Sequence, residues 1–557
     1  MGNKVGAILL DTRSIQRYVF GCNELKTNVG ASFIVDNIFN ELMCGSVLKG
    51  CGENVEVNWK ENTQVKMLEK MELEYEAAYI GGGNMLLLVR VQNKSVEENL
   101  NICRKLVRQW SKKLLLFAPG LKTGAAVGVL DISQEGFKES LNALYKQLKE
   151  NQSIVLPNVD LPCTGLTKEC DVSGKTADSY DYSIGEKRMV SAEVKAKIDA
   201  YEPANRIMCS RLEKLYPNQK YAFVDDFNKL GYKEGESYLA VVHIDGNNMG
   251  VKFSCCDSIN ERKQLSLKVQ GIVEKAFEAL LHKMVRDYDG YPKFLDAKVL
   301  QDGDVRLLPI RPLIMGGDDI TFVCPGRLGI ELAKYFVEEA SKHMLLTDEQ
   351  HALMEKSLTD GKTLSKTLSC CAGVAIVPAK YPFFRAYELA EQLCGSAKKY
   401  SRNHDDSWLD FAILHGEMSS ALEQLRKQQY TNYMGKLLHF GPYKVGGAAD
   451  FILSIERLLS LSDSLNVDKQ SKGGGLSAFK KKAAQNKVKK LREVLCGDMH
   501  GIIRYLENSE DVEAVLQKEC GREDVTAADF WQRKPGEDKE YTRFIDAIEI
   551  MDFLPIE

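Results

Sequence analysis

The chain has 557 residues, of which 44% are hydrophobic and 27% charged, and its net charge at pH 7 is −4. A chain of this length exceeds what one hydrophobic core organises, so three or four packed units are expected. The weak negative charge excludes a self-sufficient nucleic-acid binder, and partner subunits would have to supply most phosphate contacts to any RNA. No apolar stretch approaches the ~20 residues of a membrane-spanning helix, and the first residues lack signal-peptide and myristoylation patterns, which favours the cytoplasm.

Fifteen cysteines are scattered along the chain, and their number is odd. Adjacent pairs such as Cys255–Cys256 and Cys370–Cys371 rarely form useful disulfides, so the pattern favours reduced, mostly buried thiols. Cys163 and Cys170 could form half of a zinc site, but the sequence has no CxxC pair to complete it. Buried thiols are the favoured interpretation, and zinc is in doubt.

Three stretches near the N-terminus recur in the same order in the middle of the chain. Asp11 precedes Gly81 by 70 residues and Asp245 precedes Gly316 by 71. This ordered recurrence predicts a duplicated domain. The matching stretches are VGAILLDTRSIQRYVF (5–20) and YLAVVHIDGNNMGVKF (238–253), AAYIGGGNMLLLV (77–89) and RPLIMGGDDITFV (311–323), and GAAVGVLDI (124–132) and SCCAGVAIV (369–377).

Each copy is predicted to be a ferredoxin-like βαββαβ unit with one added helix, which makes the chain an α/β protein of the α+β type. The apolar stretches are the strands, and GGGN or GGDD forms the hairpin between the second and third. Helical periodicity fills the intervals, at 30–43, 97–115 and 135–152 in the first copy and at 260–288, 327–345 and 383–401 in the second.

Two further regions are predicted outside the copies. The segment between them is irregular and polar, with a helical piece near 191–217. After residue 404 strand patterns stop and an all-helical region is expected, with helices at 410–430, 447–464, 478–507 and 526–553. The basic stretch KKKAAQNKVKKLR follows a glycine-rich loop and favours a solvated helix face, with RNA or a partner as the alternative. The predicted domains are 1–152, 153–237, 238–403 and 404–557.

The second copy carries three carboxylates that the βαββαβ fold would bring together. Asp245 ends the first strand, while Asp318 and Asp319 lie at the tip of the neighbouring hairpin. Their repulsion requires a cation, and grouped oxygen ligands suit two Mg²⁺ or Mn²⁺ ions bound with a nucleotide triphosphate. A GGDD turn alone can also be a plain exposed turn; Asp245 in the right element and Lys398 after the last strand shift the balance.

Neighbouring residues are expected to contact the nucleotide. The glycines Gly316 and Gly317 leave room for it, and Lys398 could reach its triphosphate, although a surface lysine is the alternative. Asn247 and Asn248 follow Asp245, in positions where Asn also simply suits a turn.

The first copy is expected to be inactive because GGGN replaces GGDD, although Asp11 remains. It would shape half of the substrate site. Gly30 and Ser32 could lie at a helix start that binds a phosphate or a base edge, with an ordinary helix cap as the alternative.

Two palm-type domains, the second with GGDD, resemble the large polymerase/cyclase-like signature subunit of type III CRISPR effector complexes. The opening DTRSIQRYVFGCNELKTNVGAS resembles that family's first palm and HIDGNNMG its second. CTGLTKEC with SGKTAD resembles a decayed cysteine-bearing linker, and AKKYSRN (397–403) is similar to the end of GGDEF diguanylate cyclases.

The resemblance implies a complex with other type III subunits, crRNA and target RNA. On sensing target RNA such subunits join ATP molecules into cyclic oligoadenylate, and some relatives join ATP to S-adenosylmethionine. It also implies metal binding by Ile244, Asp245, Asp318 and Asp319.

The resemblance leaves two departures and several alternatives. Many family members begin with an HD nuclease domain, whereas the only His-Asp pair here, His404–Asp405, lies beyond the second palm, so no such nuclease activity is expected. A free-standing synthase of another antiphage system keeps the same chemistry. A non-catalytic scaffold is the third reading, against which the retained carboxylates argue, and a templated polymerase lacks a visible thumb, fingers and basic channel.

Overall fold

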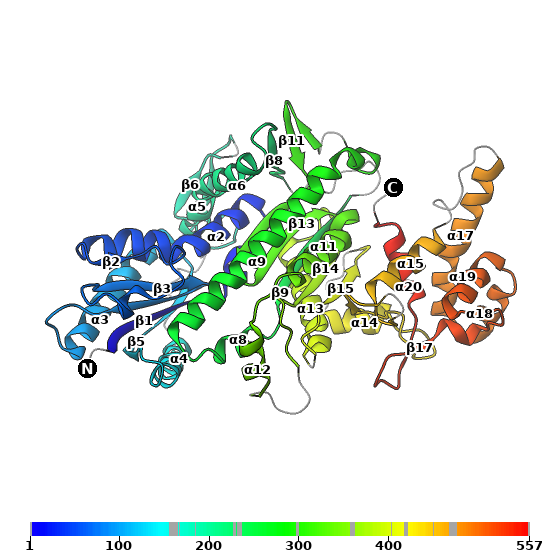
Figure 1. The fold of residues 1–557 in the computed structure, drawn as a ribbon. Helices are drawn as coiled ribbons and strands as arrows, with labels where there is room; N and C mark the ends of the chain where they lie inside the picture. Colours follow the sequence, from blue (N-terminus) through cyan, green and yellow to red (C-terminus); the bar gives the residue numbers. More distant parts are fainter. Residues whose placement is uncertain are drawn as a thin grey trace.

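A computed structural model describes residues 3–154, 165, 167–183, 185–226, 230, 237–296, 300–356, 363–402, 404–416, 421–448, 451–466 and 476–554, with only the backbone for 476–485. The two larger β-sheets follow one another across the molecule, and the long helix α9 (Ile259–Arg286) runs between them in Figure 1. The helices that follow residue 454 lie at the end of the molecule remote from the N-terminus.

The first palm, as expected, is a ferredoxin-like unit. Its sheet has the order β2-β3-β4-β1-β5, in which the first strand of the unit lies between the third and the last. The central strand is buried on both faces because helices cover one side and the second palm contributes to the same core. The elements are β1 (Lys4–Arg13), α1 (Ile15–Phe20), α2 (Leu25–Asn37), β2 (Val55–Glu56), β3 (Tyr75–Gly81), β4 (Asn84–Val89), α3 (Val96–Phe117), β5 (Lys122–Asp131) and α4 (Phe137–Ser153).

The second palm repeats this arrangement in the order β12-β13-β9-β14 and continues it with β15 and β16. The correspondence reaches single residues: Asp11 pairs with Asn84, and Asp245 pairs with Asp319. Both copies have a bulge in the strand before the hairpin. The elements are β9 (Tyr238–Gly246), α8 (Met249–Ser254), α9, β12 (Arg311–Gly316), β13 (Asp319–Pro325), α11 (Gly329–Ser341), β14 (Cys370–Pro378) and α13 (Phe383–Ser401).

The turn after the first strand is the same in both copies. Ser14 and Asn248 each have a left-handed backbone, with φ of 52° and 53°. Asn tolerates this conformation better than most residues, which accounts for Asn248 without a ligand.

The expectation of an all-helical region after residue 404 is wrong, because two strands of this region extend the sheet of the second palm. Strand β15 (Trp408–Ile413) pairs in parallel with β14, and β16 (Tyr443–Lys444) pairs with β15. All six residues of β15 are buried, and a short apolar run of this kind does not distinguish a strand from a buried helix turn. The second sheet therefore extends beyond 403.

The C-terminal region also contains the short strands β17 (Gln532–Arg533) and β18 (Glu540–Tyr541). Its helices are α14 (Leu422–Gln429), α15 (Ile455–Leu465), α17 (Leu476–Cys496), α18 (Met499–Leu506), α19 (Glu510–Cys520) and α20 (Phe544–Met551).

The segment between the palms forms a small unit, one strand of which pairs with a strand of the second palm. Its strand β8 (Tyr221–Phe223) pairs in parallel with β11 (Val305–Leu308), which belongs to an insertion in the second palm. The other elements of this segment are β6 (Ser179–Asp181), β7 (Arg188–Val190), α5 (Ala192–Asp199) and α6 (Tyr201–Leu215), and the insertion also contains β10 (Gln301–Asp302). Cys170 is buried in a small cluster with Cys22, while Cys163 lies outside the described residues.

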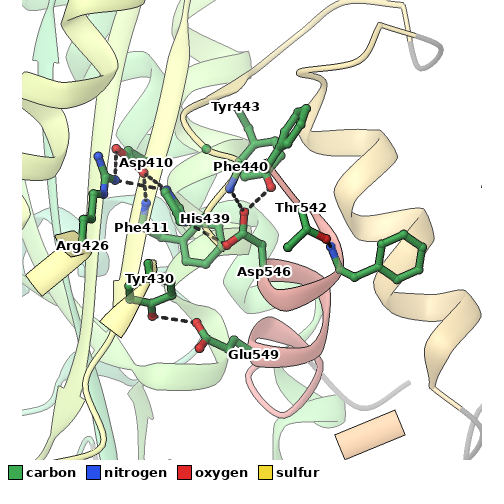
Figure 2. Close-up of polar contacts among 12 residues, drawn as sticks. Asp410, Phe411, Arg426, Tyr430, His439, Phe440, Tyr443, Thr542, Asp546 and Glu549 are labelled. Atoms are coloured by element: carbon green, nitrogen blue, oxygen red, sulfur yellow. Dashed lines mark hydrogen bonds and ion pairs between the residues drawn. The ribbon is translucent and has the colours of Figure 1, made fainter. Parts of the chain in front are cut away.

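A buried polar network joins the second palm to the C-terminal region (Figure 2). His439 contacts Asp410 of β15 through Nε2 at 3.0 Å and Asp546 of α20 through Nδ1 at 2.8 Å. Arg426 of α14 pairs with the other oxygen of Asp410 at 2.6 Å. Burial opposes the charge on Asp410, but Arg426 and His439 prevail and lower its pKa.

Among the described helices, none combines the length and the apolar composition needed to cross a bilayer.

Candidate active site between the palms

The three predicted carboxylates meet at one edge of the second sheet. Asp245 is directly opposite Asp319 in the antiparallel pairing of β9 and β13, and Asp318 lies in the two-residue turn before β13. Residues opposite each other project from the same face, with Cα atoms about 4.5–5.5 Å apart. The strand register therefore supports the predicted grouping.

The glycines of this turn allow a close approach of the two palms. Gly317 has φ of 63°, and a Cβ placed on it would lie 3.4 Å from the backbone nitrogen of Gly82. Gly82 belongs to the equivalent turn of the first palm. The two hairpin turns thus abut.

The electrostatics of the carboxylates fit a cation. Burial and then repulsion from Asp245 raise the pKa of Asp318 to about 7 and raise the pKa of Asp319 well above its usual value. Oδ1 of Asp319 is also buried without a hydrogen bond from any described residue. A hard divalent cation held by these residues would relieve both effects.

The side chains of the three carboxylates do not converge on one point. Within the described ranges, no three His, Cys, Asp or Glu side chains are arranged to hold an ion as they stand. Asp245 instead forms an ion pair with Lys398 of α13, whose Nζ also donates to the carbonyl of Gly246 at 3.2 Å. Burial alone would lower the pKa of Lys398, but Asp245 outweighs it and raises the pKa, so the ammonium stays charged.

The residue of the first palm equivalent to Lys398 carries no charge. Gln152 occupies the same position in α4 as Lys398 in α13, the sixteenth residue of the helix. Its Nε2 donates to Oδ2 of Asp11 at 2.7 Å. The first palm thus replaces Lys398 with a neutral amide and Asp319 with Asn84, and it retains one carboxylate.

Other residues predicted to contact the nucleotide instead form contacts within the protein. Asn247 is buried and donates to the carbonyl of Asp406 at 2.9 Å, and Asn248 donates to Asp405 at 2.9 Å. Asp405 in turn forms a fully buried ion pair with Lys252 at 2.8 Å. The side chain of Ile244 is buried, so only its backbone could reach a ligand.

The expected helix start at Gly30 and Ser32 is wrong, because α2 already begins at Leu25 and both residues lie in its interior. A Cβ on Gly30 would lie 1.7 Å from the carbonyl oxygen of Lys197, so this glycine permits close packing of α2 on α5. The true start of α2 has no capping signal in the sequence, because Glu24, which precedes the helix, makes no side-chain cap.

A cavity of about 210 Å³ opens between the two hairpin turns and α9, and most of its residues were missed by the sequence analysis. Ser266 follows Asp245 by the same interval as Ser32 follows Asp11, a signal that the repeat itself contained. Arg262 lies among aromatic rings and donates to the hydroxyl of Tyr145 at 2.6 Å. The cavity is lined by Tyr79, Gly81, Gly82, Asn84, Met249, Phe253, Arg262, Ser266, Val269, Gln270, Gly317 and Asp318.

A fourth carboxylate reaches the site from the first palm. Asp36 of α2 has its Oδ1 3.7 Å from a Cβ placed on Gly316. The protein packed around Asp36 and then the carboxylate of Asp319 raise the pKa of Asp36, and solvent screens part of this effect because the side chain is exposed. No local pattern identified Asp36, because its neighbourhood depends on packing between palms.

Comparison with known proteins agrees with this architecture. Residues 238–406 match the family model described as Cas10/Cmr2, second palm domain. A Csm1–Csm4 cassette in complex with cA4 has a TM-score of 0.51 at 13% identity, covering all of this chain and 70% of that chain. The cassette in complex with one ATP gives 0.51 at 13% identity, over 99% and 70%. A search of curated proteins finds no match.

The chain has two palm domains and shares the fold of these cassette chains. Residues 238–406, which match the Cas10/Cmr2 second palm domain, carry Asp245, Asp318 and Asp319.

Proposed function

We propose that the second palm is a divalent-metal-dependent nucleotidyltransferase that converts ATP into a nucleotide second messenger. The observation that carries the proposal is the pairing of Asp245 opposite Asp319, with Asp318 beside them lining a cavity between the palms. In this reaction a 3′-hydroxyl attacks the α-phosphate of ATP and pyrophosphate leaves. Two Mg²⁺ or Mn²⁺ ions held by the carboxylates would stabilise the attacking and leaving oxygens.

The chain's own residues bind and orient the nucleotide. Lys398 brings a fixed positive charge to the edge where the triphosphate would lie. The cavity beside Asp318 offers Ser266, Gln270 and Arg262 to the nucleoside portion. The glycine turns let the phosphates approach the backbone without steric hindrance.

The setting is part of the proposal. The subunit acts in the cytoplasm within a type III CRISPR complex, with partner subunits, crRNA and target RNA, and its product is a cyclic oligoadenylate or an ATP–S-adenosylmethionine conjugate. The fold shared with Csm1–Csm4 cassettes, described in complex with cA4 and with one ATP, supports this setting. A free-standing synthase shares the chemistry, and copurification with guide RNA distinguishes the two.

The test uses labelled ATP with Mg²⁺ or Mn²⁺, with the protein alone and in its complex with target RNA, and mass spectrometry of the products. The double variant Asp318→Ala/Asp319→Ala should abolish product formation. Asp302→Ala/Asp304→Ala, in the exposed β10–β11 turn, is a matched control that should retain it. Unchanged products from the first variant would reject the site, and an absence of product under every condition would favour a scaffold.

A further inference from the structure

His243 lies inside the second palm, directly behind the carboxylates. It precedes Asp245 by two residues in β9, so both side chains project from one face of the sheet. Its side chain is 4% exposed, and its ring meets that of Tyr387 edge-on with centroids 5.5 Å apart. Its position is therefore fixed by packing.

The imidazole of His243 faces two oxygen atoms of β13. Nδ1 lies 3.1 Å from Oγ1 of Thr321 and 3.3 Å from Oδ1 of Asp319. Oδ1 of Asp319 is the buried oxygen that receives no hydrogen bond from the described residues.

The chemistry of these atoms selects one tautomer. A carboxylate oxygen only accepts hydrogen bonds, whereas a threonine hydroxyl both accepts and donates. Once Asp319 is ionised, its contact with His243 is attractive only if Nδ1 carries the hydrogen, which bonds Oγ1 of Thr321 and has Oδ1 of Asp319 beside it. A carboxylate that binds a metal is commonly oriented by a neighbouring polar side chain.

We propose that His243 is a positioning residue: its Nδ1–H, whose nitrogen lies 3.3 Å from Oδ1 of Asp319, attracts that oxygen and leaves Oδ2 available to a divalent cation. The inference rests on the proposed function, because it assigns a partner to the same metal-binding carboxylate. His243 itself touches neither the nucleotide nor the cation.

The experiment measures Mn²⁺ binding to the nucleotide-free full-length protein by isothermal titration calorimetry. His243→Leu fills the space without a donor and should weaken Mn²⁺ binding by about 10-fold or more. His243→Asn can place an N–H near the position of Nδ1 and should retain most of the affinity. His243→Gln reaches the position of Nε2 instead and should behave like His243→Leu.

Thermal unfolding identifies variants that fold, and His243→Gln replaces His243→Leu if the latter does not. The inference is overturned if the folded Leu or Gln variant binds Mn²⁺ like the wild type, or if the Asn variant loses as much affinity as they do. Asp319→Asn is the reference. If it binds Mn²⁺ normally, the metal assignment of the proposed function fails and the inference fails with it, whereas a loss in Asp319→Asn with none in His243→Leu rejects the inference alone.

Discussion

Lys398→Gln gives the second palm the residue that the first palm already has at the equivalent position. The variant keeps a side chain of similar shape that can still donate to Asp245, as Gln152 does to Asp11. It removes the positive charge. It therefore separates the charge of Lys398 from its hydrogen bond.

Two magnitudes follow from the structure. The side chains of Lys398 and Asp245 are 29% and 33% exposed, so loss of the pair should cost only about 0.2–1 kcal/mol of folding stability. Loss of a fixed charge at the reacting phosphates should cost far more in rate, about 10²–10³-fold in kcat, which is equivalent to about 2.7–4 kcal/mol. The activity should fall while the protein remains folded.

The assay is the initial rate of pyrophosphate release from saturating ATP in the target-RNA-bound complex, together with urea unfolding of the same preparations. Lys398→Arg retains the charge and should lie between the wild type and Lys398→Gln. If Lys398→Gln releases pyrophosphate at the wild-type rate, Lys398 serves only to pair with Asp245 and its role at the triphosphate is refuted.

Two further predictions concern the framework of the site. In Gly373→Ala, in β14, the new Cβ would lie 2.0 Å from the carbonyl oxygen of Ala390 in α13, so the variant should lose about 1–3 kcal/mol of stability. Gly395→Ala, on the exposed side of α13, should instead gain up to about 1 kcal/mol. Thermal unfolding measures both, and equal melting temperatures would contradict the packing. His439→Leu removes the cation shared by two buried carboxylates and should cost about 3–5 kcal/mol at pH 6.

The pH dependence of His439→Leu has a definite sign. Burial disfavours the imidazolium of His439, but Asp546 and Asp410 prevail and raise its pKa above the usual value. A raised pKa contributes stability that is complete below the unfolded value of about 6.5 and is lost as the pH rises through the folded value. The difference from wild type should therefore shrink between pH 6 and pH 9 in urea unfolding, and a constant difference would contradict the assignment.

The internal repeat was enough to predict most of the fold from the sequence. Matching stretches at matching intervals define the order of strands in each palm, and that order places Asp245 beside Asp319 without knowledge of any side chain. The structure adds what local patterns do not encode. Strand β15 has Asp410 in its interior, which is tolerated because His439 and Arg426, distant in sequence, satisfy it.

Residues contributed across the palm interface were likewise absent from the expectations. Asp36 lies on α2 but acts on the hairpin of the other palm, and Tyr79 and Arg262 line the cavity from different palms. Such contacts depend on how two folded units dock, and no periodicity in one segment records that docking.

The placement of β15 determines where the second palm can be separated from its chain. A fragment that stops at residue 406, where the matched family segment ends, would lack the strand that covers one edge of β14. That edge belongs to a nine-residue strand, nearly all of it buried, and its bare amide and carbonyl groups would recruit other chains. A fragment that keeps its sheet intact must extend at least to Lys444, the last residue of β16.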